Sequence, residues 1–155
     1  MAPLPPLPDP LPADAQRVAE AIASARSGVP GRPTVTGVYG PLLHSPAFAE
    51  AVGDLGALVR FHSALPADVS ELAICGFATR CGYPYELAYH VGLAVAAGVT
   101  PDEIVAVCEG HIPDSLREDQ IAALRIVDAV CQGQSLPADL QEAFSSVYGT
   151  RGVVE

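Results

Sequence analysis

The stretch that decides the fold is "PADVSELAICGFATRCGYPYELAYHVGLAVAAG", residues 66–98. A proline stands where each half can begin a helix, at Pro66 and Pro84. A glycine stands where each helix would end, at Gly82 and Gly98. The pattern predicts two helices joined by only a few residues, and so short a connection makes them antiparallel neighbours. A helical hairpin is therefore expected at the centre of the chain.

Similar start and stop residues indicate further helices on both sides of this hairpin. Ser45-Pro46 and Thr100-Pro101 are each typical of an N-cap followed by proline at the first helical position. The helices expected outside the hairpin cover residues 14–27, 45–62, 101–108, 115–133 and 136–149. Brief alternation of β-branched residues occurs only in "PTVTGVY". The predicted fold class is all-α: a single-domain bundle of six to seven short helices built around the central hairpin.

Chain length and the N-terminal sequence indicate how the chain is divided into domains and where the protein is located. A chain of 155 residues is ordinarily one domain with a real core. Prolines make residues 1–13 a flexible arm, which leaves residues 14–155 as the helical domain. That arm has neither a basic residue nor an apolar core, so it does not resemble a secretory signal, and no window is long and apolar enough to cross a bilayer. A cytoplasmic protein is expected.

Charge and cysteine spacing exclude several classes of function. The net charge is −10, and every positive charge is an arginine. This balance argues against nucleic acid and membrane partners. The four cysteines form no CxxC pair, so neither a zinc site nor a thioredoxin-like dithiol is predicted, and each cysteine is expected to be a reduced apolar filler. They are Cys75, Cys81, Cys108 and Cys131.

The hairpin also carries the side chains best suited to proton transfer. Glu71 is a carboxylate in an otherwise apolar helix, while Glu86 and His90 lie one turn apart on the next helix. A carboxylate in apolar surroundings and a histidine beside a carboxylate are both suited to acid–base chemistry near neutral pH. Alternatively, Glu71 pairs locally, and Glu86 and His90 form a solvated surface pair.

Residues 71–104, which run from "ELAICGF" to "AAGVTPDEI", resemble the core of the carboxymuconolactone decarboxylase and AhpD-like superfamily. The matching features are Glu71 on one helix, His90 on the next, and the closing "AAGVTPDEI". The likeness extends over about residues 36–154. In the peroxidase branch of this superfamily a Cys-x-x-Cys precedes the histidine, but Tyr83 and Glu86 occupy those positions here. A dithiol peroxidase is therefore disfavoured.

In the decarboxylase branch a glutamate stands four residues before the histidine, as in "ELAYH". The resemblance therefore implies a lyase that needs neither cofactor nor metal and acts on a small carboxylate or lactone by decarboxylation, isomerisation or ring opening. His90 would be the general acid/base, Glu86 would orient it or share its proton, and Glu71 would be the second carboxylate. Substrate contacts are expected from Tyr85, Arg60, Cys75 and Tyr83.

Two alternatives remain: an AhpD-like redox protein, and a non-catalytic subunit of an oligomer that binds a small molecule. The resemblance also implies a homo-oligomer, a trimer or hexamer. Relatives continue through one more apolar helix, so the ending "YGTRGVVE" suggests that the C-terminal helix is missing or shortened.

Overall fold

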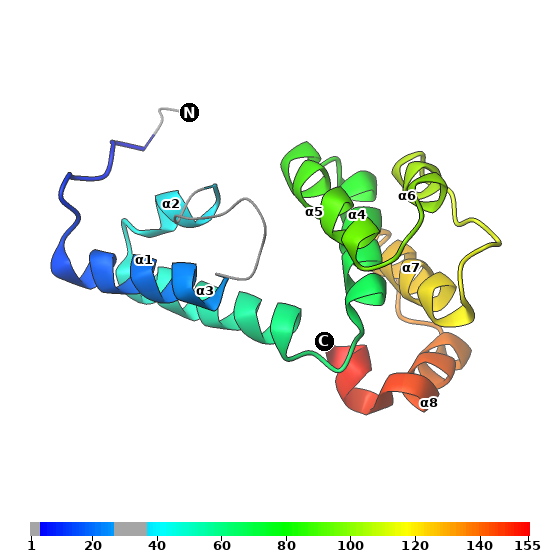
Figure 1. Cartoon of the computed structure of the whole chain (residues 1–155). Helices are drawn as coiled ribbons and strands as arrows, with labels where there is room; N and C mark the ends of the chain where they lie inside the picture. The colour runs from blue at the N-terminus through cyan, green and yellow to red at the C-terminus, as the bar shows by residue number, and fades with distance from the viewer. Residues whose placement is uncertain (1–3, 27–36) are drawn as a thin grey trace. The chain divides into compact units, whose positions relative to one another are not determined.

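The computed structural model describes residues 4–26 and 37–155, and it is all-α across them, as predicted (Figure 1). These residues form eight helices, whereas six to seven were expected, and the addition is the single helical turn of α2 (Tyr39–Leu42). Most of the "PTVTGVY" segment lies outside the described residues. The chain divides into two compact units, Met1–His62 and Ser63–Glu155.

The first unit is built on two long helices, α1 (Ala13–Ala25) and α3 (Pro46–Phe61), which pack against each other. An ion pair between Arg17 and Glu50, 2.7 Å long, joins them at the surface. The core of this unit consists of Val18, Ile22, Leu43 and Ala49, with Leu7 and Leu11 packed against it. The proline-rich segment expected to be a flexible arm therefore contributes two leucines to this core.

The second unit contains the predicted hairpin, α4 (Ala67–Cys81) and α5 (Pro84–Ala96). It continues through α6 (Pro101–Cys108), α7 (Glu118–Cys131) and α8 (Ala138–Val154). Helix α4 is central because it packs against α5, α6 and α7 (Figure 1). One core cluster includes the fully buried Leu72 and Leu124, and a second contains Val69, Ala123 and Phe144.

The signals at helix ends act as predicted at most positions. Gly82 takes the left-handed conformation (φ 69°) that ends α4, and the Tyr83 amide then donates to the Ala78 carbonyl over 2.8 Å. Thr100 forms a capping box with Glu103 at the start of α6. Ser45 precedes α3 as expected, but its side chain accepts no capping hydrogen bond. The proline that follows Ser45 is the effective start signal there.

Helix α8 runs further than the sequence predicted. Gly149 is non-helical (φ 68°), so the predicted end at this position is a kink, after which helical turns resume as far as Val154. The Glu155 carboxylate then accepts hydrogen bonds from the Ser63 hydroxyl (2.9 Å) and the Ala64 amide (2.6 Å). The end of α8 is thereby attached to the segment that leads into α4. None of the helices in the two described ranges combines the length and apolar character needed to cross a membrane.

Candidate functional site

The predicted hairpin brings His90 of α5 against Glu71 of α4. The imidazole Nδ1 lies 2.6 Å from Oε2 of Glu71, within hydrogen-bonding distance. Both side chains are largely buried, with 12% of His90 and 7% of Glu71 exposed. A carboxylate and an imidazole at this depth need each other as partners, because burial of an unpaired polar group is costly. One partner of Glu71 therefore lies across the hairpin.

Glu86 lies on the other side of the same imidazole. Its Oε2 is 3.6 Å from Nε2 of His90, one helical turn away on α5. This is an ion-pair distance when the histidine is protonated, but it is longer than an ordinary hydrogen bond. The Glu86 side chain is 40% exposed, so it faces solvent while Glu71 faces the core. His90 thus lies between a buried and an accessible carboxylate.

The surroundings of the imidazole are apolar on one side and aromatic on another. The Tyr89 ring meets the His90 ring edge to face, with ring centroids 5.0 Å apart. Cys75 and Ala94, each one turn further along the helix from a site residue, are fully buried in the core cluster. Small side chains at these positions allow α4 and α5 to approach closely enough for Glu71 to reach His90.

This arrangement fixes which nitrogen of His90 is available for chemistry. When Glu71 is ionised it can only accept a hydrogen bond, and the Nδ1–H of His90 is then the donor over the 2.6 Å contact. In the neutral imidazole the Nε2 lone pair is then left free on the side of Glu86. A histidine held in this way can take up a proton at Nε2, and the buried carboxylate stabilises the resulting imidazolium.

The predicted substrate-contacting residues differ in their exposure and in the unit of the chain to which they belong. Tyr83 immediately precedes α5, Tyr85 lies in its first turn, and both are about half exposed. The centroids of the Tyr83 and Phe77 rings are 6.0 Å apart. Arg60 belongs to the first unit, where its guanidinium lies 5.4 Å from the centre of the Phe61 ring. Cys75 is wholly enclosed in the core, so contact with a substrate would require that core to open.

The free thiols occupy different surroundings in the structure. Burial raises the pKa of Cys75 to about 12, which makes this thiol unreactive at neutral pH, as expected of a core filler. Cys81 and Cys131, in contrast, lie with their sulfur atoms 3.7 Å apart. Spacing along the chain could not reveal this pair because its members are on different helices.

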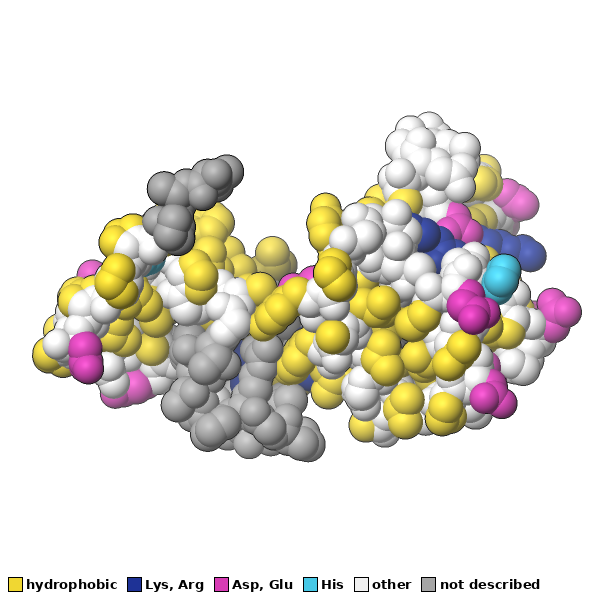
Figure 2. Space-filling model, turned by 90° about the horizontal axis from the view of Figure 1, so that it is seen from above, with side chains coloured by type: hydrophobic (Ala, Val, Ile, Leu, Met, Phe, Trp, Pro, Cys, Tyr) yellow, Lys and Arg dark blue, Asp and Glu magenta, His cyan; other side chains and the backbone are white. Residues whose placement is uncertain are grey.

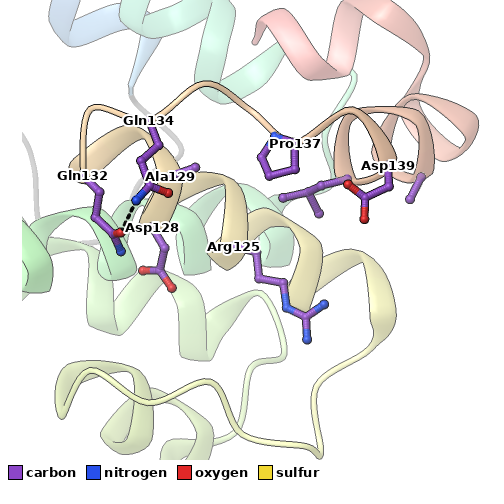
Figure 3. A pocket seen from close by; sticks show the side chains of 9 residues that line it. Arg125, Asp128, Ala129, Gln132, Gln134, Pro137 and Asp139 are labelled. Atoms are coloured by element: carbon purple, nitrogen blue, oxygen red, sulfur yellow. Dashed lines mark hydrogen bonds between the residues drawn. The ribbon is translucent and has the colours of Figure 1, made fainter.

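A groove of about 360 Å³ lies between the end of α7 and the start of α8 (Figure 3). Its polar lining includes Arg125 and Asp139, and a 2.8 Å hydrogen bond joins the side chains of Gln134 and Gln132. None of the site residues predicted from the sequence lines this groove. It is therefore a feature distinct from the Glu71–His90–Glu86 cluster.

The sequence matches the model of the carboxymuconolactone decarboxylase family over residues 46–129, which is more than half of the chain. The chain therefore belongs to the carboxymuconolactone decarboxylase family, as the resemblance of the hairpin indicated. The matched region runs from the start of α3 into α7 and includes Glu71, Glu86 and His90. No curated protein and no solved structure matches the sequence significantly.

Proposed function

We propose that this protein is a cofactor-independent acid–base enzyme that acts on a small carboxylate or lactone, with His90 as the group that transfers the proton. The observation that supports this most is the 2.6 Å contact between Nδ1 of His90 and the buried carboxylate of Glu71. That contact orients the imidazole and leaves Nε2 for the substrate. Membership in the carboxymuconolactone decarboxylase family supports the choice of substrate class.

The proposed chemistry uses the three side chains in different roles. Nε2 of His90 removes a proton from a carbon next to a carboxyl or lactone carbonyl, or returns one after carbon dioxide has left. Glu71 stabilises the imidazolium that forms. Glu86, whose side chain is 40% exposed and 3.6 Å from Nε2, exchanges the proton with solvent. Decarboxylation and isomerisation need this transfer at carbon, whereas ring opening needs the same histidine to take a proton from the water that attacks the lactone carbonyl and to return it to the oxygen that leaves.

A thiol-based reaction at this hairpin fits the structure less well. The positions that carry cysteines in the peroxidase branch are Tyr83 and Glu86. The cysteine closest to Glu71 along α4 is Cys75, and its pKa of about 12 keeps the thiol protonated at neutral pH. The proposed enzyme is therefore a lyase or isomerase in type and not a peroxidase.

Solvent isotope exchange can test the proposal with a panel of candidate substrates. Carboxymuconolactone and several small carboxylated lactones would be incubated with the protein in deuterium oxide. NMR would follow deuterium uptake at carbon, loss of substrate and release of carbon dioxide. The wild type is expected to accelerate at least one of these reactions. His90→Ala should reduce the rate by about 10²–10⁴-fold, the usual scale for a positioned proton-transfer group.

His111→Ala is the matched control because His111 is well exposed and its Nδ1 lies 3.9 Å from the carboxylate of Glu109. It should retain the wild-type rate. Two results would contradict the proposal: full activity in His90→Ala, or wild-type protein that binds members of the panel in a thermal-shift assay yet changes none of them. The second result would support the non-catalytic binding subunit.

A further inference from the structure

Two thiols that are far apart in the chain meet where α4 and α7 end. Cys81 is the last residue of α4 and Cys131 is the last residue of α7. Their Sγ atoms are 3.7 Å apart, although 50 residues separate them. The two helices pack against each other, and an ion pair between Arg80 and Asp128 joins them within one turn of the sulfur atoms. Helix packing therefore determines the contact between the two thiols.

We propose that Cys81 and Cys131 form a reversible intramolecular disulfide, a redox modification site that uses none of the side chains of the proton-transfer cluster. A disulfide needs a sulfur–sulfur distance of about 2.05 Å, so the two atoms have to approach by less than about 2 Å. Both helices end at or just after the cysteine, and Gly82 (φ 69°) and Gly133 (φ 65°) turn the chain away. Terminal turns can make so small a movement more easily than a helix interior can.

Both thiols are also reachable by a small reagent. Each cysteine is half-buried. Asp128, which lies one helical turn before Cys131, and Gln132, which follows it directly, line the open groove between α7 and α8 (Figure 3). Cys75 differs from the pair because it is wholly buried. Exposure and mutual contact together select Cys81 and Cys131 from the four cysteines.

The reaction is a thiol–disulfide exchange with a low-molecular-weight disulfide. Either thiol can attack first, and both orders give the same products; in one order Cys81 is the first nucleophile. The Cys81 thiolate attacks one sulfur of the reagent, forms a mixed disulfide and releases one thiolate. Cys131 then loses its proton, attacks the Cys81 sulfur and releases the second. The protein loses two electrons and two protons, and the reagent becomes two thiols.

Glutathione redox buffers provide the test. Reduced full-length protein would be equilibrated with mixtures of oxidised and reduced glutathione, quenched with acid, unfolded and alkylated. Mass spectrometry should show two protected cysteines, no attached glutathione, and one cross-linked peptide pair that contains Cys81 and Cys131. The disulfide closes a long loop and so restricts the unfolded chain. The oxidised protein should therefore have a higher melting temperature than the reduced protein.

Serine variants test which cysteines form the disulfide. Cys81→Ser and Cys131→Ser should each abolish the cross-linked peptide and the rise in melting temperature, whereas Cys108→Ser should keep both. Circular dichroism confirms that each variant is folded. The proposal is overturned if all four thiols of the folded wild type stay alkylatable across the buffers. It is equally overturned if glutathione accumulates on Cys81 or Cys131 without the cross-link, or if the cross-link joins two chains.

Discussion

At the scale of single residues, the proton-transfer cluster depends on the difference between two carboxylates. Glu71 is buried and 2.6 Å from Nδ1 of His90, whereas the Glu86 side chain is partly exposed and 3.6 Å from Nε2. A hydrogen bond to a buried charge is worth about 1.5–3 kcal/mol, whereas an exposed ion pair is worth about 0–1 kcal/mol. The two glutamates should therefore differ in their effect on catalysis.

Glu71→Gln should lower turnover about 10–100-fold, because the imidazolium loses its buried counter-charge. Glu86→Gln should lower turnover about fivefold or less, because solvent already screens that charge. Steady-state kinetics on the substrate that responds best in the isotope-exchange panel would measure both variants. Equal losses for the two variants, or a larger loss for Glu86→Gln, would contradict this division of roles between the carboxylates.

The sequence revealed the members of this cluster but not their distances. Helical spacing pairs Glu86 with His90 and gave it the orienting role. Glu71 is 19 residues before His90, so its approach depends on how α4 rotates against α5. That rotation follows from packing of small buried residues such as Ala78 and Ala94. Local spacing alone could not determine which carboxylate would be closer.

At the scale of helices, one glycine determines how closely α4 approaches α7. A methyl group added to Gly76 would lie 2.6 Å from Cδ2 of the fully buried Leu124. Gly76→Ala should therefore lower the free energy of unfolding by about 1–3 kcal/mol. Gly92 of α5 is the control because its added methyl group would meet nothing within 4 Å.

Gly92→Ala should raise the free energy of unfolding by about 0.5–1 kcal/mol, because alanine restricts the unfolded chain. Urea unfolding followed by circular dichroism measures both variants. A Gly76→Ala variant as stable as the wild type would mean that α4 and α7 pack less closely than described.

Two helix starts that look alike in the sequence should respond differently to mutation. Thr100 accepts a hydrogen bond from the Glu103 amide in a capping box, so Thr100→Ala should cost about 1 kcal/mol of stability. Ser45 makes no such bond, and Ser45→Ala should change stability by less than about 0.5 kcal/mol. Chemical denaturation would distinguish them, and a Ser45→Ala penalty as large as that of Thr100→Ala would contradict the assignment.

The dependence of stability on pH provides a second test of the same capping box. The backbone amide of Thr100 is the main cause that holds the pKa of Glu103 below its ordinary value of 4.5. Since the pKa is lower in the folded state, the contribution of this carboxylate to stability is complete above the unfolded-state pKa. It is lost as pH falls through the folded-state pKa. The stability difference between wild type and Glu103→Gln should therefore shrink below about pH 4.5.

Most helix boundaries could be predicted because proline and glycine act locally. A proline such as Pro84 fixes its own φ, and a glycine such as Gly82 tolerates the left-handed conformation, whatever surrounds them. Ser45 shows the limit of such reasoning, since an N-cap residue has to turn its hydroxyl toward the helix and its sequence position does not ensure this. The contact between Cys81 and Cys131 is a tertiary one and left no local signal.

At the scale of the whole molecule, the apolar surface supports the proposed homo-oligomer. Phe48, Leu55 and Leu58 are exposed on α3, and their spacing of seven and three residues places them on one face. Apolar side chains are also visible on the surfaces of both units in Figure 2. Such clusters on small proteins commonly mark contacts between subunits.

Light scattering at micromolar concentration should therefore give a mass that is a multiple of the 16.0 kDa chain, a trimer or hexamer. Leu55→Asp should shift the mass toward the single chain, whereas Val105→Asp, an exposed position on α6, should not. A wild-type protein that stays at the single-chain mass would contradict the oligomer.

The protonation state of the His90 ring tests the central claim most directly, because it can be measured on the protein alone, without a substrate. Long-range proton–nitrogen NMR of the full-length protein, labelled with ¹⁵N at histidine, distinguishes the two nitrogens of each imidazole. The neutral His90 ring should carry its proton on Nδ1 and leave Nε2 bare, while the exposed His111 should show the averaged signals of a solvated ring. A neutral His90 protonated on Nε2 would contradict the proposal that Glu71 holds this histidine ready to accept a proton.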